Sequence, residues 1–182
     1  MLILASASPR RRELLQYITP DFVAVALDLD ESLPPEIAPR AGAEILAQRK
    51  ARAAAGTHPD NIVIGADTIV ALDGVIYEKP KDADDAFRIL RTLSGREHFV
   101  YTGVAIVSPK GERIFSEETA VRFTQMSDEE IRAYIETGDP MDKAGAYGIQ
   151  GKGALFVSGI RGDFYNVMGL PVCRLARELA AL

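Results

Sequence analysis

Three consecutive arginines near the start of the chain are the first residues whose types and spacing could do chemistry. Arg10, Arg11 and Arg12 directly follow Ser8 and Pro9. Serine is a favoured N-cap and proline suits the first position of a helix, so the arginines fall in the first turn of a predicted helix. That turn carries unpaired backbone N–H groups and the positive end of the helix dipole, where cations are unfavourable unless an anion joins them. Any one arginine alone could be solvated surface, but the three together favour a local phosphate site.

This predicted phosphate site is not a P-loop. The chain has no Gly-x-x-x-x-Gly-Lys-Ser/Thr sequence, and its first glycine is Gly42, well past the predicted turn. A loop that cradles phosphates with glycine backbone N–H groups is therefore missing from this end of the chain. Support for phosphate binding has to come from other residues.

A carboxylate and a lysine form the second group of chemical interest. Asp67 lies in Gly65-Ala-Asp-Thr-Ile69 and is expected directly after a buried strand, while Lys79 lies in Glu78-Lys-Pro80 on the far side of a predicted hairpin. The end of a buried strand at the edge of a sheet is a usual place for an active-site carboxylate. Asp67 could instead cap a turn, and Lys79 could be plain surface. Together with the arginines, however, these residues suit a nucleotide bound with Mg²⁺.

Composition and charge limit the class of protein. The chain has 182 residues, of which 47% are hydrophobic and 26% charged, and this allows a full core in a single domain over 1–182. The formal net charge of −5 argues against a broad nucleic-acid surface. The apolar start is too short for a secretion signal and no apolar run approaches bilayer length, so we expect a cytoplasmic protein with neither nucleic acid nor membrane as partner.

The single cysteine carries little chemistry. Cys173 excludes an internal disulfide and a zinc site built on cysteines. It falls in an apolar helical pattern, so it is expected to be a core residue.

The elements that must position these residues alternate between strands and helices. Asp73-Gly74 is a strong hairpin pattern, and Ser127 with Glu130 forms a predicted capping box. Strands are expected over 2–5, 22–27, 61–64, 68–72, 75–78, 98–107, 113–124 and 154–157. Helices are expected over 9–18, 39–56, 82–95, 127–137 and 170–182, with an acidic loop over 28–39 and a Gly-rich loop over 139–153. A mixed α/β fold with a partly antiparallel sheet follows.

Seven short motifs then permit a comparison with a known family. They are Ser6-Ala-Ser-Pro-Arg-Arg11, Asp30-Glu31, Lys50-Ala-Arg52, Gly65-Ala-Asp-Thr68, Glu78-Lys-Pro80, Thr92-Leu-Ser-Gly95 and Asp142-Lys-Ala-Gly-Ala-Tyr-Gly-Ile-Gln150. In this order they closely resemble the Maf family of nucleoside triphosphate pyrophosphatases. The resemblance implies an α/β fold with a mixed twisted sheet, flanking helices and two lobes around a cleft, similar to the inosine triphosphate pyrophosphatases. It also implies a homodimer and a divalent cation, Mg²⁺ or Mn²⁺.

The same resemblance implies the reaction and the roles of individual residues. The forms Gly-Ala-Asp-Thr and Tyr-Gly-Ile-Gln look like the subfamily that hydrolyses dTTP and UTP between the α and β phosphates. Asp67 is the expected proton acceptor and, with Glu31, the expected metal ligand; Lys50 and Lys79 are expected on the triphosphate. The residues expected to hold phosphate or select the base are Ser6, Arg10, Arg11, Thr68 and Gln150. A glutamine offers both a donor and an acceptor, which matches the N3–H and O4 of uracil and thymine.

Three other functions remain open at the level of sequence. The first is a non-catalytic regulator of septum formation, the effect from which the family takes its name. The second is a pyrophosphatase acting on 7-methyl-GTP, and the third is a phosphatase that removes only the γ-phosphate. The acidic charge balance weakens DNA binding by such a regulator, and the products released would distinguish the third.

Overall fold

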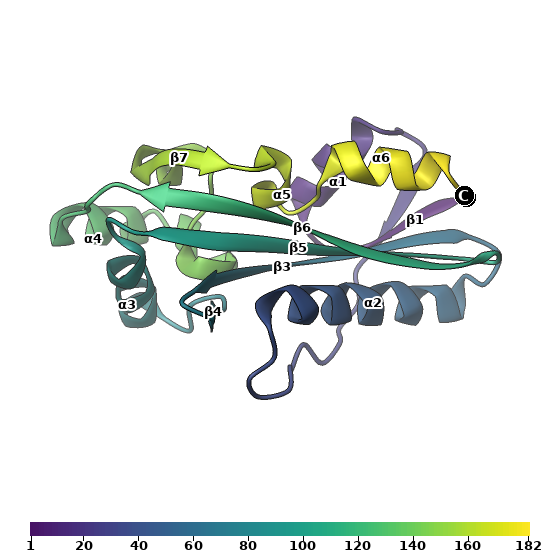
Figure 1. Ribbon diagram of the computed structural model, residues 1–182, viewed down its shortest axis with the longest axis horizontal. Helices are drawn as coiled ribbons and strands as arrows, with labels where there is room; N and C mark the ends of the chain where they lie inside the picture. Colours follow the sequence, from purple (N-terminus) through teal and green to yellow (C-terminus); the bar gives the residue numbers. More distant parts are fainter.

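A seven-stranded mixed sheet runs through the whole molecule (Figure 1). The computed structural model describes residues 1–182. The strands lie in the order β2-β1-β3-β5-β6-β7, and β4 pairs with β3 outside this path. Their bounds are β1 (Leu2–Ala5), β2 (Phe22–Val25), β3 (Ile62–Leu72), β4 (Val75–Tyr77), β5 (Glu97–Ser108), β6 (Gly111–Phe123) and β7 (Val157–Arg161). β1 is parallel to β2 and β3, and all other pairs are antiparallel. The predicted mixed α/β fold is confirmed.

Helices cover both faces of this sheet. The α-helices are α1 (Pro9–Gln16), α2 (Pro39–Thr57), α3 (Ala83–Leu93), α4 (Asp128–Glu136), α5 (Phe164–Met168) and α6 (Val172–Ala180). Three 3₁₀ helices follow α4, namely η1 (Asp139–Asp142), η2 (Ala144–Ala146) and η3 (Gly151–Phe156). α2 lies below the sheet in Figure 1, whereas α1, α5 and α6 lie above it. None of the helices is long and apolar enough to cross a membrane.

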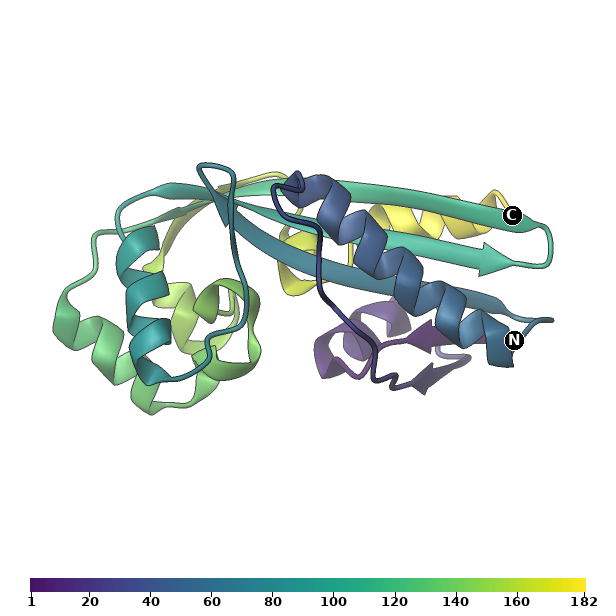
Figure 2. The same ribbon diagram turned by 90° about the horizontal axis from the view of Figure 1, so that it is seen from below.

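The two largest of four hydrophobic core clusters define two lobes. One core packs under α3 and α4 and includes Leu72, Leu90 and Phe123, all buried. The other lies between the sheet and α1 and α6, and includes Leu4 and Leu14. Figure 2 shows the two lobes side by side along the long strands, which connect them. The predicted arrangement of two lobes that share one sheet is therefore observed.

The close contact between α2 and the sheet depends on small residues. Ala43 and Ala47 are fully buried on the inner face of α2. Opposite them lie Gly65 and Gly103, where an added Cβ would stand only 2.3 Å from the carbonyl oxygens of Ala47 and Ala43. The helix backbone therefore rests directly on β3 and β5. This contact sets the distance between the sheet and Lys50, which also lies on α2.

Local patterns placed several element ends correctly. Ser8 caps α1 with Pro9 at its first position, and Asp82 caps α3. The capping box of Ser127 and Glu130 is present at the start of α4. The turn at Asp73 joins β3 to β4, as the hairpin pattern predicted.

Between 151 and 170, one expectation is wrong and one helix is missing from the prediction. The strand expected over 154–157 is mostly the 3₁₀ helix η3, and the strand β7 follows it at Val157–Arg161. The short helix α5 was not predicted at all. A short apolar run does not by itself distinguish a strand from a buried helical turn, and here the choice is made by pairing of β7 with β6.

The expected core position of Cys173 is also wrong, because its side chain is exposed. α6 begins at Val172, and its inward stripe consists of Val172, Leu175 and Leu179. These residues are spaced three and four apart, as one face of a helix requires, and Cys173 lies off that stripe.

Candidate active site

The site lies where β3 changes its neighbour. β1 pairs with residues 62–65 of β3, and β4 pairs with Val70–Leu72, so residues 66–69 have no strand beside them on that edge. A cleft of about 940 Å³ opens there between the lobes, and Asp67 and Thr68 line it. This volume is in the range of small-molecule sites, roughly 300–1,000 Å³.

Asp67 lies inside a strand, which corrects the expectation that it follows one at the edge of the sheet. β3 continues through it because β5 pairs with β3 from Val63 to Ala71, with Asp67 opposite Gly103. Side chains alternate along a strand, so Asp67 and Thr68 point to opposite faces of the sheet. The contacts agree: Asp67 meets Lys50 of α2, and Thr68 meets Arg11 of α1. The cleft therefore wraps around the edge of β3.

On the α2 face, two carboxylates share one ammonium group. Lys50 Nζ donates to Asp67 Oδ1 and lies 2.6 Å from Glu31 Oε1. The side chains of Lys50 and Asp67 are only 15% and 12% exposed, so water screens their interaction poorly. The sequence places these three residues far apart, and the fold brings them together.

The loop that carries Glu31 is tied to α2. Arg49 Nη1 donates to the carbonyl oxygens of Asp30 and Ser32, at 3.2 and 2.6 Å, on either side of Glu31. Burial by itself raises the pKa of the Glu31 carboxyl, but the hydrogen bond and charge of Lys50 outweigh it and hold the pKa below its usual value. Glu31 is therefore ionised at neutral pH.

The donor set of this face fits a hard divalent cation. Asp67 and Glu31 already surround one cation, the Lys50 ammonium, with carboxylate oxygens. No group of three or more His, Cys, Asp or Glu side chains is gathered as a metal site anywhere in the structure. Mg²⁺ and Mn²⁺ are commonly held by one or two carboxylates together with substrate phosphates. Asp67 and Glu31 would thus hold such an ion jointly with the substrate.

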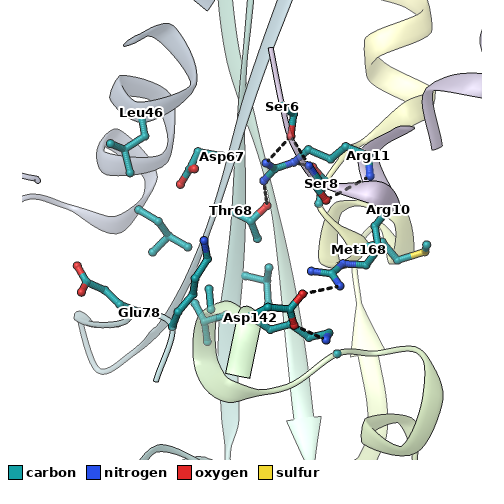
Figure 3. Close-up of a pocket in the computed structure, with 18 of the residues that line it drawn as sticks. Ser6, Ser8, Arg10, Arg11, Leu46, Asp67, Thr68, Glu78, Asp142 and Met168 are labelled. Atoms are coloured by element: carbon teal, nitrogen blue, oxygen red, sulfur yellow. Dashed lines mark hydrogen bonds and ion pairs between the residues drawn. The ribbon is translucent and has the colours of Figure 1, made fainter. Parts of the chain in front are cut away.

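On the other face, Arg11 is held in one orientation by three acceptors. Its Nε donates to Gly169 O at 2.8 Å, its Nη2 to Thr68 Oγ1 at 3.0 Å, and its Nη1 to Ser6 Oγ at 3.4 Å. Burial lowers the pKa of this guanidinium, while the negative charge of Asp67 raises it. Figure 3 shows Arg11 between Ser6 and Thr68 on the wall of the cleft. Arg11 is therefore a preorganised donor group.

The three arginines of the opening helix do not act as one cluster. Arg10 and Arg11 both line the cleft, and Arg10 Nη1 lies 3.8 Å from Asp142 Oδ2 of the other lobe (Figure 3). Arg12 is exposed and is not among the residues that line the cleft.

The remaining predicted residues, Lys79 and Gln150, are exposed side chains that line the same cleft. Lys79 comes just after β4, and Gln150 comes just before η3. All predicted site residues are thus brought to one cleft: Ser6, Arg10, Arg11, Glu31, Lys50, Asp67, Thr68, Lys79 and Gln150. Their individual roles stay predictions.

Some residues of the site were given no role by sequence reasoning. Asp142 and Lys143 belong to a quoted motif, and in the structure they form an ion pair of 2.7 Å at the cleft. Thr102 and Asn166 lie behind the wall of the cleft, where both are fully buried. No local pattern marks them, since Thr102 is an ordinary strand residue by type and Asn166 lies in the unpredicted α5.

The fold defines a class of α/β protein similar to the Ham1 proteins. The HAM1 protein of Coxiella burnetii matches with a TM-score of 0.52 at 14% identity, over 100% of this chain and 98% of that chain. The Ham1 protein of Staphylococcus aureus matches with a TM-score of 0.51 at 19% identity, over 67% and 71%. At such low identity these similarities concern the fold alone.

Sequence relatives define the family more narrowly. The family model described as Maf-like protein matches residues 1–182. A protein of Geobacillus sp. (strain WCH70) named dTTP/UTP pyrophosphatase is 51% identical over 181 residues, 100% of this chain and 97% of that protein. One of the same name from Symbiobacterium thermophilum is 51% identical over 98% of this chain and 92% of its own length. The chain belongs to the Maf family.

Proposed function

We propose that this protein is a nucleoside triphosphate pyrophosphatase that hydrolyses dTTP and UTP to the nucleoside monophosphate and pyrophosphate. The observation that carries the proposal is that one cleft holds two different groups of side chains, one on each face of β3. Asp67, Glu31 and Lys50 gather on one side of β3, and Arg11 and Thr68 on the other. Full-length relatives at about half identity bear the name of this activity, which supports the choice of substrate.

The geometry accounts for the reaction as follows. A water oxygen forms a bond to the α-phosphorus while the bond from that phosphorus to the bridging oxygen breaks, and pyrophosphate leaves. Asp67, fixed in a strand, orients this water and accepts its proton. Lys50, Lys79 and Arg10 line the same cleft and balance the charge that develops on the phosphate oxygens. A divalent cation held by Asp67 and Glu31 supplies further charge stabilisation when it is bound.

The proposed preference for uracil and thymine rests on the side chains expected around the base. Gln150 offers its amide donor to O4 of uracil or thymine, and N3–H is left for another acceptor that lines the cleft. The two bases differ by one methyl group, which supports discrimination of only about 1–3 kcal/mol. Both dTTP and UTP are therefore proposed as substrates, and a larger purine is proposed to fit poorly.

A nucleotide panel tests the proposed function. With Mg²⁺ or Mn²⁺ we expect pyrophosphate from dTTP and UTP, less product from CTP, ATP and GTP, and an activity loss of at least about a hundredfold with EDTA, on the scale of one lost electrostatic contributor. Pyrophosphate and orthophosphate are measured separately. Preference for 7-methyl-GTP would contradict the subfamily. Release of orthophosphate would indicate a γ-phosphatase, and no turnover at all would favour the regulator of septum formation.

We further propose that the protein acts as a homodimer in the cytoplasm. The resemblance to Maf proteins supports the dimer, and nucleoside triphosphates as substrates support the compartment. Sedimentation of the purified protein measures the oligomeric state directly.

Lys79→Ala is expected to raise KM for dTTP and UTP by about tenfold, because a charge-assisted hydrogen bond to a phosphate contributes about 1.5–3 kcal/mol. The ranking of nucleotides should not change, since the triphosphate is common to all of them. Lys81→Ala is the matched control, because Lys81 is also exposed but lies outside the cleft. Steady-state kinetics on both variants decide the matter: a changed ranking in Lys79→Ala would place this lysine at the base instead.

A further inference from the structure

Behind the wall of the cleft, a line of hydrogen bonds continues from Arg11 into the core. Thr68 and Thr102 lie directly opposite each other in the pairing of β3 with β5. Their hydroxyl oxygens are 2.9 Å apart, and Thr102 is fully buried. Thr102 Oγ1 in turn lies 2.8 Å from the carbonyl oxygen of Asn166. Arg11 and Thr68 both face the cleft, whereas Thr102 and Asn166 do not.

The chemistry of the two ends gives this line a single direction. A carbonyl oxygen only accepts, so Thr102 must use its one hydroxyl proton on Asn166 O. Thr102 then accepts, and the proton between the two threonines comes from Thr68. At the other end a guanidinium only donates, so Arg11 donates to Thr68. The hydroxyl proton of Thr68 is therefore committed to the core, and only a lone pair is left for a group in the cleft.

Asn166 is a fixed anchor for this direction. Its Oδ1 accepts from the backbone N–H of Thr102 at 3.1 Å, and its Nδ2 donates to Val100 O and Thr119 Oγ1, both at 3.0 Å. Reversal of the amide would place two donors against each other at Thr102. Thr119 uses its own proton on Asp163 O at 2.8 Å. Every hydroxyl proton around Asn166 is thus assigned.

We propose that Thr102 is a positioning residue that makes the Thr68 hydroxyl an acceptor only, and that this selects uracil and thymine against cytosine. The inference rests on the proposed function and deepens it. N3 of uracil and thymine carries a hydrogen and donates to the lone pair of Thr68. N3 of cytosine has no hydrogen, so two acceptors would face each other without a proton between them. Phosphate oxygens are also acceptors, so the same direction places Thr68 at the base rather than at the phosphates.

Gln150 does not provide this discrimination by itself. It is exposed, and an amide that is free to turn by 180° presents either its oxygen or its nitrogen. It pairs with the O4 of uracil in one orientation and with the amino group of cytosine in the other. A group with a fixed direction is needed, and Thr68 is such a group.

Thr102→Val tests the proposal, because valine keeps the shape of threonine and removes the hydroxyl. Asn166 O remains paired with the backbone N–H of Gly169 at 3.0 Å, so the change leaves this carbonyl with a partner. The Thr68 proton becomes free to turn into the cleft and to donate to N3 of cytosine. We expect the ratio of kcat/KM for UTP over CTP to fall by about tenfold, in line with the cost of an unpaired buried polar group.

Two variants control for a purely structural effect. Thr102→Ser restores the hydroxyl and should restore the wild-type ratio. Thr119→Val removes an equally buried strand hydroxyl that also contacts Asn166 but not Thr68, so it should lower the melting temperature without moving the ratio. An unchanged ratio in Thr102→Val, or an equal fall in Thr119→Val, overturns the proposal. If Thr102→Val does not fold, Thr102→Ala replaces it in the same comparison.

Calorimetric binding of UMP and CMP to the wild-type protein is measured in parallel. Binding of UMP at least about tenfold tighter than CMP is expected, and equal binding overturns the inference even when no variant folds. Failure of the proposed function is recognised separately, as wild-type protein that releases no pyrophosphate from UTP. In that case the binding ratio of UMP to CMP in wild type and Thr102→Val still decides the role of Thr102.

Discussion

Asp67→Asn is expected to lower kcat for dTTP and UTP by about two to four powers of ten, the usual contribution of a positioned general base. Asparagine has the same shape, and its oxygen still accepts from Lys50, so the variant should stay folded. What it loses is the negative charge that would hold the proposed divalent cation and the proposed capacity to take a proton from water. Pyrophosphate release gives the rate, and circular dichroism with thermal melting monitors the fold.

Asp73→Asn is the control for this variant. Asp67 lies inside β3, whereas Asp73 directly follows β3 in the turn to β4, where it pairs with Arg96 at the surface, 2.6 Å away. Its replacement should leave turnover within about twofold of wild type, since surface ion pairs contribute little. A folded Asp67→Asn protein with near-normal turnover would remove Asp67 from the mechanism.

Lys50→Met is expected to lower kcat/KM by about two to three powers of ten, the typical cost of one preorganised electrostatic donor. Methionine preserves the length of the side chain on α2 but removes the ammonium that Asp67 and Glu31 share. The two carboxylates then lack the ammonium that they share, although the charges of Lys79 and Arg11 still act on Glu31, and like charges disfavour ionisation. The damage should therefore extend to metal binding and to the positioning of the water.

The pH profile of Lys50→Met provides a second measurement. Lys50 holds the pKa of Glu31 below its usual value, so removal of Lys50 raises that pKa. Glu31 then becomes protonated at a higher pH, and the acid limb of kcat/KM should move upward. Arg52→Met on the same helix is the control, because Arg52 pairs with Glu112 outside the cleft. An acid limb in Lys50→Met that coincides with that of Arg52→Met would show that Lys50 does not act through Glu31.

Several features of this protein follow from its sequence alone. The N-cap at Ser8, the capping box at Ser127 and the turn at Asp73 each depend on residues a few positions apart. Alternation of strand and helix patterns was enough to predict a mixed α/β fold. The motif order was enough to indicate the family, which the full-length match to the Maf-like model confirms.

The tertiary structure decided which side chains from distant segments of the chain lie close together. Strand pairing with β5 carried β3 through Asp67, where the sequence had predicted a strand end, and so placed Asp67 and Thr68 on opposite faces. α6 packs against the core through one row of apolar side chains, and Cys173 lies off this row and is exposed. Caps, turns and periodicity are set by neighbours along the chain, and the sequence determines them directly. The sharing of Lys50 by two carboxylates and the direction of hydrogen bonds at Thr68 depend on register and packing between distant segments, and only the folded chain sets these.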